Sequence, residues 1–264
     1  MLLKDKSDFQ RCIYIGQDGC FSARYKNLVL SSVYQPVFSR NNKVVGIEAL
    51  VRIKDNRGNS VPPNVFFQPQ NYSVTDQLNV DRLSRAIHIR NFSLSAFHNH
   101  LLFLNFLPIS SEQLARDGVD TSLLCNRLKE LQVCNKRVVI ELLELDAKEE
   151  ETFCRASNKL RESKFLVAID DYGCDASTDK RVTAIQPNLV KFDRSLLLEF
   201  MRGEEKRLTD GLALAKSCHA LTVIEGIETE AQLEAMKAIG FDLYQGYYLA
   251  LPSAIEPVIQ QCVS

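Results

Sequence analysis

From Val33 onward, short apolar runs alternate with longer amphipathic segments. A short apolar run bounded by polar turn residues is typical of a buried strand, and apolar residues at helical spacing are typical of a helix. The strands that this pattern predicts are Val33–Phe38, Val44–Val51, Leu101–Leu107, Val138–Leu143, Phe165–Ile169, Leu189–Phe192, Leu221–Ile224 and Leu243–Tyr244. The helices that it predicts between them are Gln77–Phe97, Glu112–Leu131, Ala147–Leu160, Arg194–Cys218 and Glu230–Ile239.

Strands that alternate with helices indicate parallel βαβ units, and this number of strands favours a closed, TIM-like (β/α)8 barrel of the α/β class over an open sheet. An open dinucleotide-binding sheet would need a glycine-rich turn after its first strand, where this chain has Asn41-Asn42-Lys43. The same turn is too short for a parallel crossover. The first strand is therefore predicted to run antiparallel to the second.

The first residues of the chain are less periodic than the rest and contain the turn Gly16-Gln17-Asp18-Gly19. We therefore expect residues 1–30 to form a short N-terminal extension packed on a barrel domain of residues 31–264. The chain length of 264 residues suits one barrel of this kind. No further sensor or cyclase domain is visible in the sequence.

The charge balance and the cysteines exclude several classes of protein. The net charge is −1, from 32 basic and 33 acidic residues, so neither a nucleic-acid polymer nor a membrane is expected as a partner. The eight cysteines include no C-x-x-C pair, which argues against a zinc ribbon or a thioredoxin-like site. With no signal-peptide pattern and no membrane-length apolar run, we expect a cytoplasmic protein with reduced thiols.

Polar side chains interrupt or follow the predicted strands near their C-terminal ends. Barrel enzymes place their active sites at this rim, so these side chains are expected to converge. One such residue alone is more often a surface ion pair or a helix cap, but a series on successive strands favours a common site. The series consists of Glu48, Arg52, Asn105, Glu141, Glu144, Asp170, Asp171, Lys191, Glu225 and Gln245.

Several carboxylates cannot all ionise together in apolar surroundings without positive charge, so the series predicts bound metal. Hard oxygen ligands favour Mg²⁺ or Mn²⁺ over zinc, and the sequence leaves the choice between these two open. The adjacent Asp170 and Asp171 could flank two ions roughly 3.5–4 Å apart, an arrangement used for phosphodiester cleavage.

The same residues, together with their neighbours, resemble the ordered motifs of the EAL-domain family of cyclic di-GMP phosphodiesterases. The resemblance extends from about Val33 to Pro252 and implies a stand-alone, single-domain member of the family. The matching segments are Tyr34-Gln35-Pro36, Glu48-Ala49-Leu50, Leu104-Asn105, Glu141-Leu142-Leu143-Glu144, Asp170-Asp171-Tyr172-Gly173, Lys191-Phe192-Asp193, Glu225-Gly226-Ile227-Glu228-Thr229 and Gln245-Gly246-Tyr247.

The resemblance implies a role for each matching residue. The implied ligands of one metal are Glu48, Asn105, Glu141 and Asp170, and those of a second are Asp170, Asp171 and Glu225. The implied catalytic residues are Glu48, Asp171, Lys191 and Glu225, with Lys191 holding the attacking water or the charge that develops on the phosphate. The implied substrate-side residues are Gln35, Arg52 and Gln245, and the implied loop anchors are Glu144 and Glu228.

The function implied by the resemblance is metal-dependent hydrolysis of cyclic di-GMP to linear pGpG by a homodimer, which lowers this second messenger in bacterial signalling. One segment departs from the family pattern: Asp175 replaces a glycine and Ala176 an aromatic residue, directly after Cys174. This departure favours an alternative, a weak or inactive cyclic di-GMP sensor that acts through a protein partner. An adaptor that no longer binds the nucleotide would be favoured by loss of Gln35, Arg52 or Glu48, and all three are present.

Overall fold

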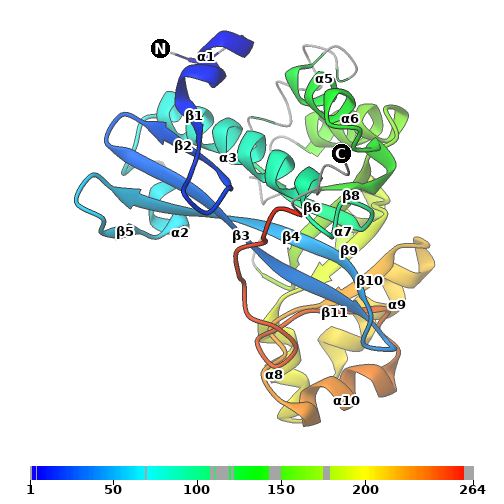
Figure 1. Cartoon of the computed structure of the whole chain (residues 1–264). Helices are drawn as coiled ribbons and strands as arrows, with labels where there is room; N and C mark the ends of the chain where they lie inside the picture. Colours follow the sequence, from blue (N-terminus) through cyan, green and yellow to red (C-terminus); the bar gives the residue numbers. More distant parts are fainter. Residues whose placement is uncertain are drawn as a thin grey trace, which may run out of the picture.

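The structure is a computed structural model that describes residues 2–3, 5–68, 70–107, 110, 119, 122–142, 150–174 and 179–258. Within them, eight strands close into a ring with helices around it, which confirms the predicted TIM-like barrel (Figure 1). In the order of the ring these strands are β3 (Leu28–Ser39), β11 (Leu243–Tyr244), β10 (Leu221–Ile224), β9 (Leu189–Phe192), β8 (Leu166–Tyr172), β7 (Val138–Leu142), β6 (Leu101–Phe106) and β4 (Val44–Asp55).

The first strand of the ring runs against all the others. β3 pairs antiparallel with both β4 and β11, whereas the remaining pairs of the ring are parallel. The turn at Asn41-Asn42-Lys43 joins β3 directly to β4, and Asn42 adopts a positive φ of 55° there. The predicted antiparallel first strand is thus confirmed, because the connection leaves no length for a crossover.

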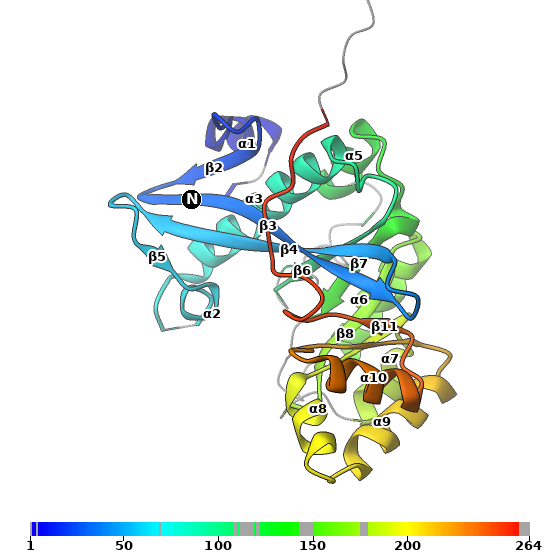
Figure 2. The ribbon, with the colours of Figure 1, turned by 60° about the horizontal axis from the view of Figure 1, so that its bottom comes forward.

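β3 and β4 continue past the barrel as a long two-stranded ribbon (Figures 1 and 2). The N-terminal elements α1 (Lys6–Cys12), β1 (Ile13–Ile15) and β2 (Phe21–Tyr25) pack at this end, where β2 pairs with β3. β5 (Ser60–Val61) and α2 (Pro63–Phe66) lie on the β4 side. A separate apolar core, centred on Leu30, Ile53, Phe66 and Leu83, holds this lobe together.

The helices that cover the barrel are α3 (Val74–Leu94), α5 (Leu123–Glu130), α6 (Glu150–Glu162), α7 (Asp179–Ile185), α8 (Arg194–Met201), α9 (Lys206–Ser217) and α10 (Glu230–Ile239), and a 3₁₀ turn, Asn135–Arg137, precedes β7. The predicted helix Arg194–Cys218 is wrong as a single element. α8 stops because Gly203 adopts a positive φ of 92° and the amides of Gly203 and Glu204 bond back to Phe200 and Glu199.

Other boundaries differ less. β9, β10 and β11 have the predicted bounds, and α3 begins and ends three residues earlier than predicted. α5 covers the end of the predicted helix Glu112–Leu131, whose first part lies mostly outside the described residues. Among the described segments, no helix combines the length and the apolar character that crossing a membrane requires.

Candidate active site

The interior of the barrel is filled by one apolar layer. It consists of Val37, Phe103, Val139, Ala168, Leu189, Val223 and Leu243, each from a different strand of the ring. β4 contributes Gly46, where a Cβ would lie 2.7 Å from the Phe103 ring, so only glycine leaves room for that ring. Inward-facing residues recur at every second position of a strand, so the next inward layer lies two residues farther along each strand.

That next layer is almost wholly polar. Two residues beyond the apolar layer, toward the C-terminal ends of the parallel strands, lie Glu48, Asn105, Glu141, Asp170, Lys191, Glu225 and Gln245, and Gln35 takes the corresponding place on the antiparallel β3. Seven of the predicted site residues therefore follow from one geometric rule, and Gln35 follows from the same rule with the strand reversed. The structure brings all of them to one end of the barrel.

Two side-chain amides hold the carboxylate of Glu48, and a third polar residue lies opposite it in the ladder. Asn105 Nδ2 donates to Glu48 Oε1 at 3.2 Å, and Gln245 Nε2 donates to Glu48 Oε2 at 2.8 Å. Gln35 is the cross-strand partner of Glu48 in the β3–β4 ladder, and its amide donates to the carbonyl of Ala250 at 3.2 Å. The carboxylate of Glu48 is thereby held in one orientation by residues from both sides of the barrel.

Lys191 lies at the centre of the acidic layer. Its Nζ is 2.6 Å from Glu141 Oε1, 2.8 Å from Glu225 Oε1, 3.0 Å from Asp170 Oδ1 and 3.4 Å from Glu48 Oε2. The lysine side chain is 1% exposed and that of Glu141 is fully buried. A single buried cation thus serves four carboxylates, which leaves this group with an excess of three negative charges when all are ionised.

The burial and the crowding of charge change the pKa values in the layer. Burial would lower the pKa of Lys191, but the surrounding carboxylates hold it well above its ordinary value. Burial, reinforced by the charge of Glu48, raises the pKa of Glu141 well above its ordinary value. Burial also raises the pKa of Glu225 to about 8, against the opposing charge of Lys191. The layer therefore favours added positive charge.

A second acidic group adjoins the first. Oxygen atoms of Asp170, Asp171 and Glu225 all lie within 4.8 Å of one another. Asp171 is the next-to-last residue of β8. It lies at a bulge in the pairing of β8 with β9 and adopts a positive φ of 51°. In a regular strand two consecutive side chains point to opposite faces. The bulge instead brings the consecutive carboxylates of Asp170 and Asp171 toward the same place.

These residues fit divalent metal ions. The carboxylate of Glu141 is fully buried, and its Oε2 has no hydrogen-bond partner within the part of the chain that the structure describes. Adding Asp171 to the four carboxylates around Lys191 gives five negative charges against one positive charge, an excess that two divalent ions would neutralise. Carboxylate and amide oxygens are the ligands that Mg²⁺, Mn²⁺ and Ca²⁺ prefer.

Two further predicted site residues, Arg52 and Glu228, lie outside the polar layer. Arg52 is farther along β4, where its Nη1 donates to the carbonyl of Val51, and its charge acts on His88. Glu228 follows β10 and pairs with Arg194 of α8 at 2.5 Å. Glu144 lies outside the described residues, as do Asp175 and Ala176 of the divergent segment.

Three residues that support the rim are not among the predicted site residues, although two of them stand in the matching motifs. Asp193 caps α8 by accepting from the Ser195 amide at 2.8 Å, and Arg194 provides the partner of Glu228. Gly226 has a φ of 69° and packs against the Arg194 side chain. The available signal was the Asp-x-Ser pattern after a predicted strand, which is typical of a helix N-terminus.

A comparison with protein families decides which one this barrel represents. The model of the EAL domain matches residues 22–252 of the chain. The chain belongs to the EAL domain family. The match includes every strand of the ring and all eight residues of the polar layer. The resemblance stated from the motifs is thereby confirmed.

Several curated proteins are similar to the chain. The oxygen sensor protein DosP of Escherichia coli is 26% identical over 251 residues, covering 88% of this chain and 29% of DosP. The probable cyclic di-GMP phosphodiesterase PdeB of the same organism is 26% identical over 224 residues, 83% of this chain and 42% of PdeB. The chain thus spans less than half the length of these two curated relatives.

A solved structure of similar shape is that of the Bacillus subtilis YkuI protein, which has an EAL domain and is in complex with its substrate c-di-GMP and calcium. It is 27% identical to this chain, with a TM-score of 0.71, and the alignment covers 85% of this chain and 56% of YkuI. The barrel of this EAL domain therefore has the same fold as one that holds a nucleotide and a divalent ion.

Proposed function

We propose that this EAL domain hydrolyses cyclic di-GMP to linear pGpG with the help of two divalent cations, Mg²⁺ or Mn²⁺. The observation that carries the proposal is the polar layer itself, in which one lysine faces four carboxylates at the mouth of the barrel. The presence of both c-di-GMP and calcium in the YkuI complex supports it. Lowering a bacterial second messenger is the biological role that this reaction would serve.

The residues divide into two groups of metal ligands. Glu48, Asn105, Glu141 and Asp170 would hold one ion, and Asp170, Asp171 and Glu225 would hold the other. Bound ions of this kind lower the pKa of a coordinated water and neutralise the charge that develops on a phosphoryl group. Asn105 and Gln245 fix the orientation of the Glu48 carboxylate, which keeps its oxygen atoms directed at the ligand position.

We expect Lys191 to give up some of its ion pairs with the carboxylates and to contact the substrate instead. Its ammonium is buried among carboxylates, whose charge keeps it protonated. When metal neutralises those carboxylates, the same ammonium can donate to the attacking water or to a phosphate oxygen. Arg52 and Gln35 are assigned to substrate contact, Arg52 because a guanidinium pairs with phosphate through two parallel hydrogen bonds.

The direct test is turnover. Purified protein is incubated with cyclic di-GMP and Mg²⁺ or Mn²⁺, and pGpG is measured by chromatography, with a Glu48→Ala variant beside the wild type. A Glu234→Ala variant is the matched control, because Glu234 is an exposed acid that pairs only with Lys237 among the described residues. We expect pGpG from the wild type and the control, and loss of at least a hundredfold in Glu48→Ala. Full activity in Glu48→Ala would contradict the metal assignment.

A second function is favoured by the segment after Gly173, where Asp175 and Ala176 depart from the family motif. It is a weak or inactive cyclic di-GMP sensor that acts through a protein partner. Binding of cyclic di-GMP in calorimetry, without pGpG at any metal concentration, would favour this function over hydrolysis. A homodimer belongs to both proposals, and light scattering of the protein with and without cyclic di-GMP tests that state.

A further inference from the structure

A large cavity lies on the outer side of the barrel, and none of its described lining residues belongs to the polar layer. It has a volume of about 990 Å³ and lies between α1, the middle of α3 and the whole length of α5. This volume is at the upper end of the range for small-molecule sites, roughly 300–1,000 Å³. The cavity joins the N-terminal lobe to the barrel, since Lys6 of α1 pairs with Glu130 of α5 at 2.9 Å across it.

The walls of the cavity are apolar. Phe9 and Ile13 line it from the N-terminal side, Ala86 and Ile89 from α3, and Leu123 and Leu124 from α5. Phe106 also lines it and belongs to β6, directly after Asn105 of the polar layer. Because successive side chains of a strand point to opposite faces, Asn105 faces the barrel interior and Phe106 faces this cavity.

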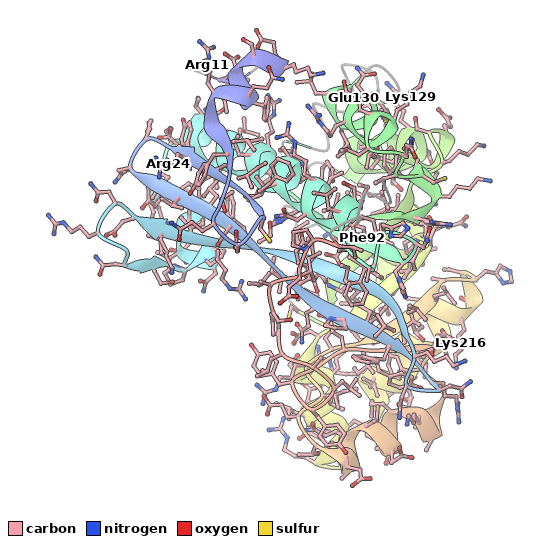
Figure 3. The ribbon with its side chains drawn as sticks, in the orientation of Figure 1. Arg11, Arg24, Phe92, Lys129, Glu130 and Lys216 are labelled. Atoms are coloured by element: carbon pink, nitrogen blue, oxygen red, sulfur yellow. The ribbon has the colours of Figure 1, made fainter. Side chains whose placement is uncertain are left out.

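The charged residues of the cavity have one dominant sign. Six of the described lining residues are cationic, and one, Glu130, is anionic; the cations are Lys6, Arg82, Arg85, Arg90, Arg127 and Lys129. Glu130 already pairs with Lys6 at 2.9 Å and with Arg127 at 2.8 Å, and Arg85 pairs with Asp81, which lies outside the lining, at 2.5 Å. The cations still outnumber these two carboxylates. In Figure 3, Lys129 and Glu130 project from α5 in the region where α1 approaches it.

Arg90 shows the imbalance most clearly. Its guanidinium stacks over the Phe21 ring, 5.1 Å from the centroid, and among the described residues it forms no ion pair of its own. Burial, together with the positive charge of Arg127, lowers the pKa of Arg90, and Glu130 opposes this effect. Glu130 pairs with Arg127 rather than with Arg90, so a further anion beside Arg90 would relieve the repulsion between the two guanidinium groups.

We propose that this cavity binds a small amphipathic anion, with an apolar chain or ring against Ile89, Phe106 and Leu124 and a single carboxylate or similar head group at Arg90 and Arg127. The occupant matches the two properties of the walls at once: the apolar body replaces water on the apolar surface, and the head group supplies the negative charge that the cationic rim lacks. Arginine suits such a head group because its planar fork can donate two parallel hydrogen bonds.

The test uses decanoate as the probe, added below its micellar concentration and measured by isothermal titration calorimetry. We expect one decanoate per chain, and binding at least tenfold weaker for decan-1-ol and for decyltrimethylammonium, which lack the negative charge. Two variants address the two parts of the site. Arg90→Gln removes a cation of the rim, and Ala86→Phe fills the cavity; each is expected to weaken decanoate binding at least tenfold.

Arg24→Gln is the matched control for Arg90→Gln. Arg24 also stacks over an aromatic ring of the N-terminal lobe, Tyr14, at 4.7 Å, but it is exposed and does not line the cavity. Circular dichroism and thermal melting establish that each variant is folded, and Leu123→Trp replaces Ala86→Phe if that variant is not. Decanoate binding that is absent in the wild type, or equal in Arg90→Gln and Arg24→Gln, would overturn the proposal. Binding to phosphatidylglycerol vesicles without binding of monomeric decanoate would also overturn it.

Discussion

Lys191 Nζ lies 2.6 Å from Glu141 Oε1, and both side chains are buried within the barrel. Neither residue could be buried alone, because an unpaired charge in an apolar interior is strongly unfavourable. Each residue therefore depends on the other for its place in the fold. The layer as a whole has too much negative charge for one lysine to balance, and we expect this excess to connect the stability of the protein to the binding of divalent cations.

The first prediction concerns Lys191→Met, which removes the only cation that contacts these four carboxylates among the described residues. We expect the free energy of unfolding in a metal-free buffer to fall by about 3 kcal/mol, the lower end of the cost of breaking a buried ion pair. Urea unfolding with a chelator present measures it. Addition of Mn²⁺ should restore part of the loss, and an unchanged urea midpoint in the variant would contradict the central role of Lys191.

The second prediction concerns metal as a stabilising ligand. A metal ion that binds only the folded protein raises stability by about 2.7 kcal/mol at a concentration of 100 times its dissociation constant. We therefore expect Mn²⁺ or Mg²⁺ to raise the melting temperature of the wild type by several degrees. Glu141→Gln keeps the shape of the buried side chain but removes its charge, and should abolish most of the shift. Glu234→Gln should keep it, since Glu234 is exposed on α10.

The third prediction concerns Gln245, whose amide holds Glu48 Oε2 at 2.8 Å. Gln245→Leu fills the same space without donating. Loss of a residue that orients a metal ligand typically lowers metal affinity or activity 10- to 100-fold, roughly. We expect a loss of metal affinity in that range. It would be measured as an increase in the Mn²⁺ concentration that gives half-maximal pGpG formation. An unchanged value would show that Glu48 needs no support from Gln245.

The fourth prediction concerns the pH dependence of stability. His88 is buried beside Ser32, and burial, together with the charges of Arg85 and Arg52, lowers its pKa from 6.5 to about 3. The unfolded chain binds a proton at His88 below pH 6.5, but the folded protein does not until near pH 3. The stability from neutral His88 is therefore complete above pH 6.5 and is lost as the pH falls.

Between pH 7 and pH 5 this effect should lower the free energy of unfolding by about 2 kcal/mol, measured by urea titration at each pH. His88→Gln keeps a polar group beside Ser32 but cannot take up the proton, so its stability should change less over the same interval. The same pH dependence in wild type and variant would assign the effect to other groups.

The barrel could be predicted from the sequence because its inner strands are apolar runs of the right length, and β9, β10 and β11 even have the predicted bounds. The polar layer could be predicted for the same reason: an ionisable residue inside such a run, as at Glu141 or Lys191, stands out against its neighbours. The family match then confirmed the resemblance that the motifs had indicated.

Other features could not be predicted, because they depend on contacts that are distant in the sequence. The N-terminal strands β1 and β2 are short and form only because the β3–β4 ribbon offers them an edge. The break between α8 and α9 depends on one glycine, Gly203, within a charged stretch that is equally typical of an exposed helix. Which carboxylates surround Lys191 depends on the closure of the ring.

That closure has a consequence for synthesis of the protein. β11 and β3 meet through only two register pairs, Leu243 with Ser39 and Tyr244 with Phe38, and the bond from Gln245 to Glu48 spans 197 residues. During translation the acidic strands leave the ribosome long before the strand that completes the cylinder. Contacts at such separation form late in folding. Until β11 emerges, the nascent chain carries its carboxylates on an open, unsealed sheet, so a ribosome that stops before Leu243 would release a chain prone to aggregation.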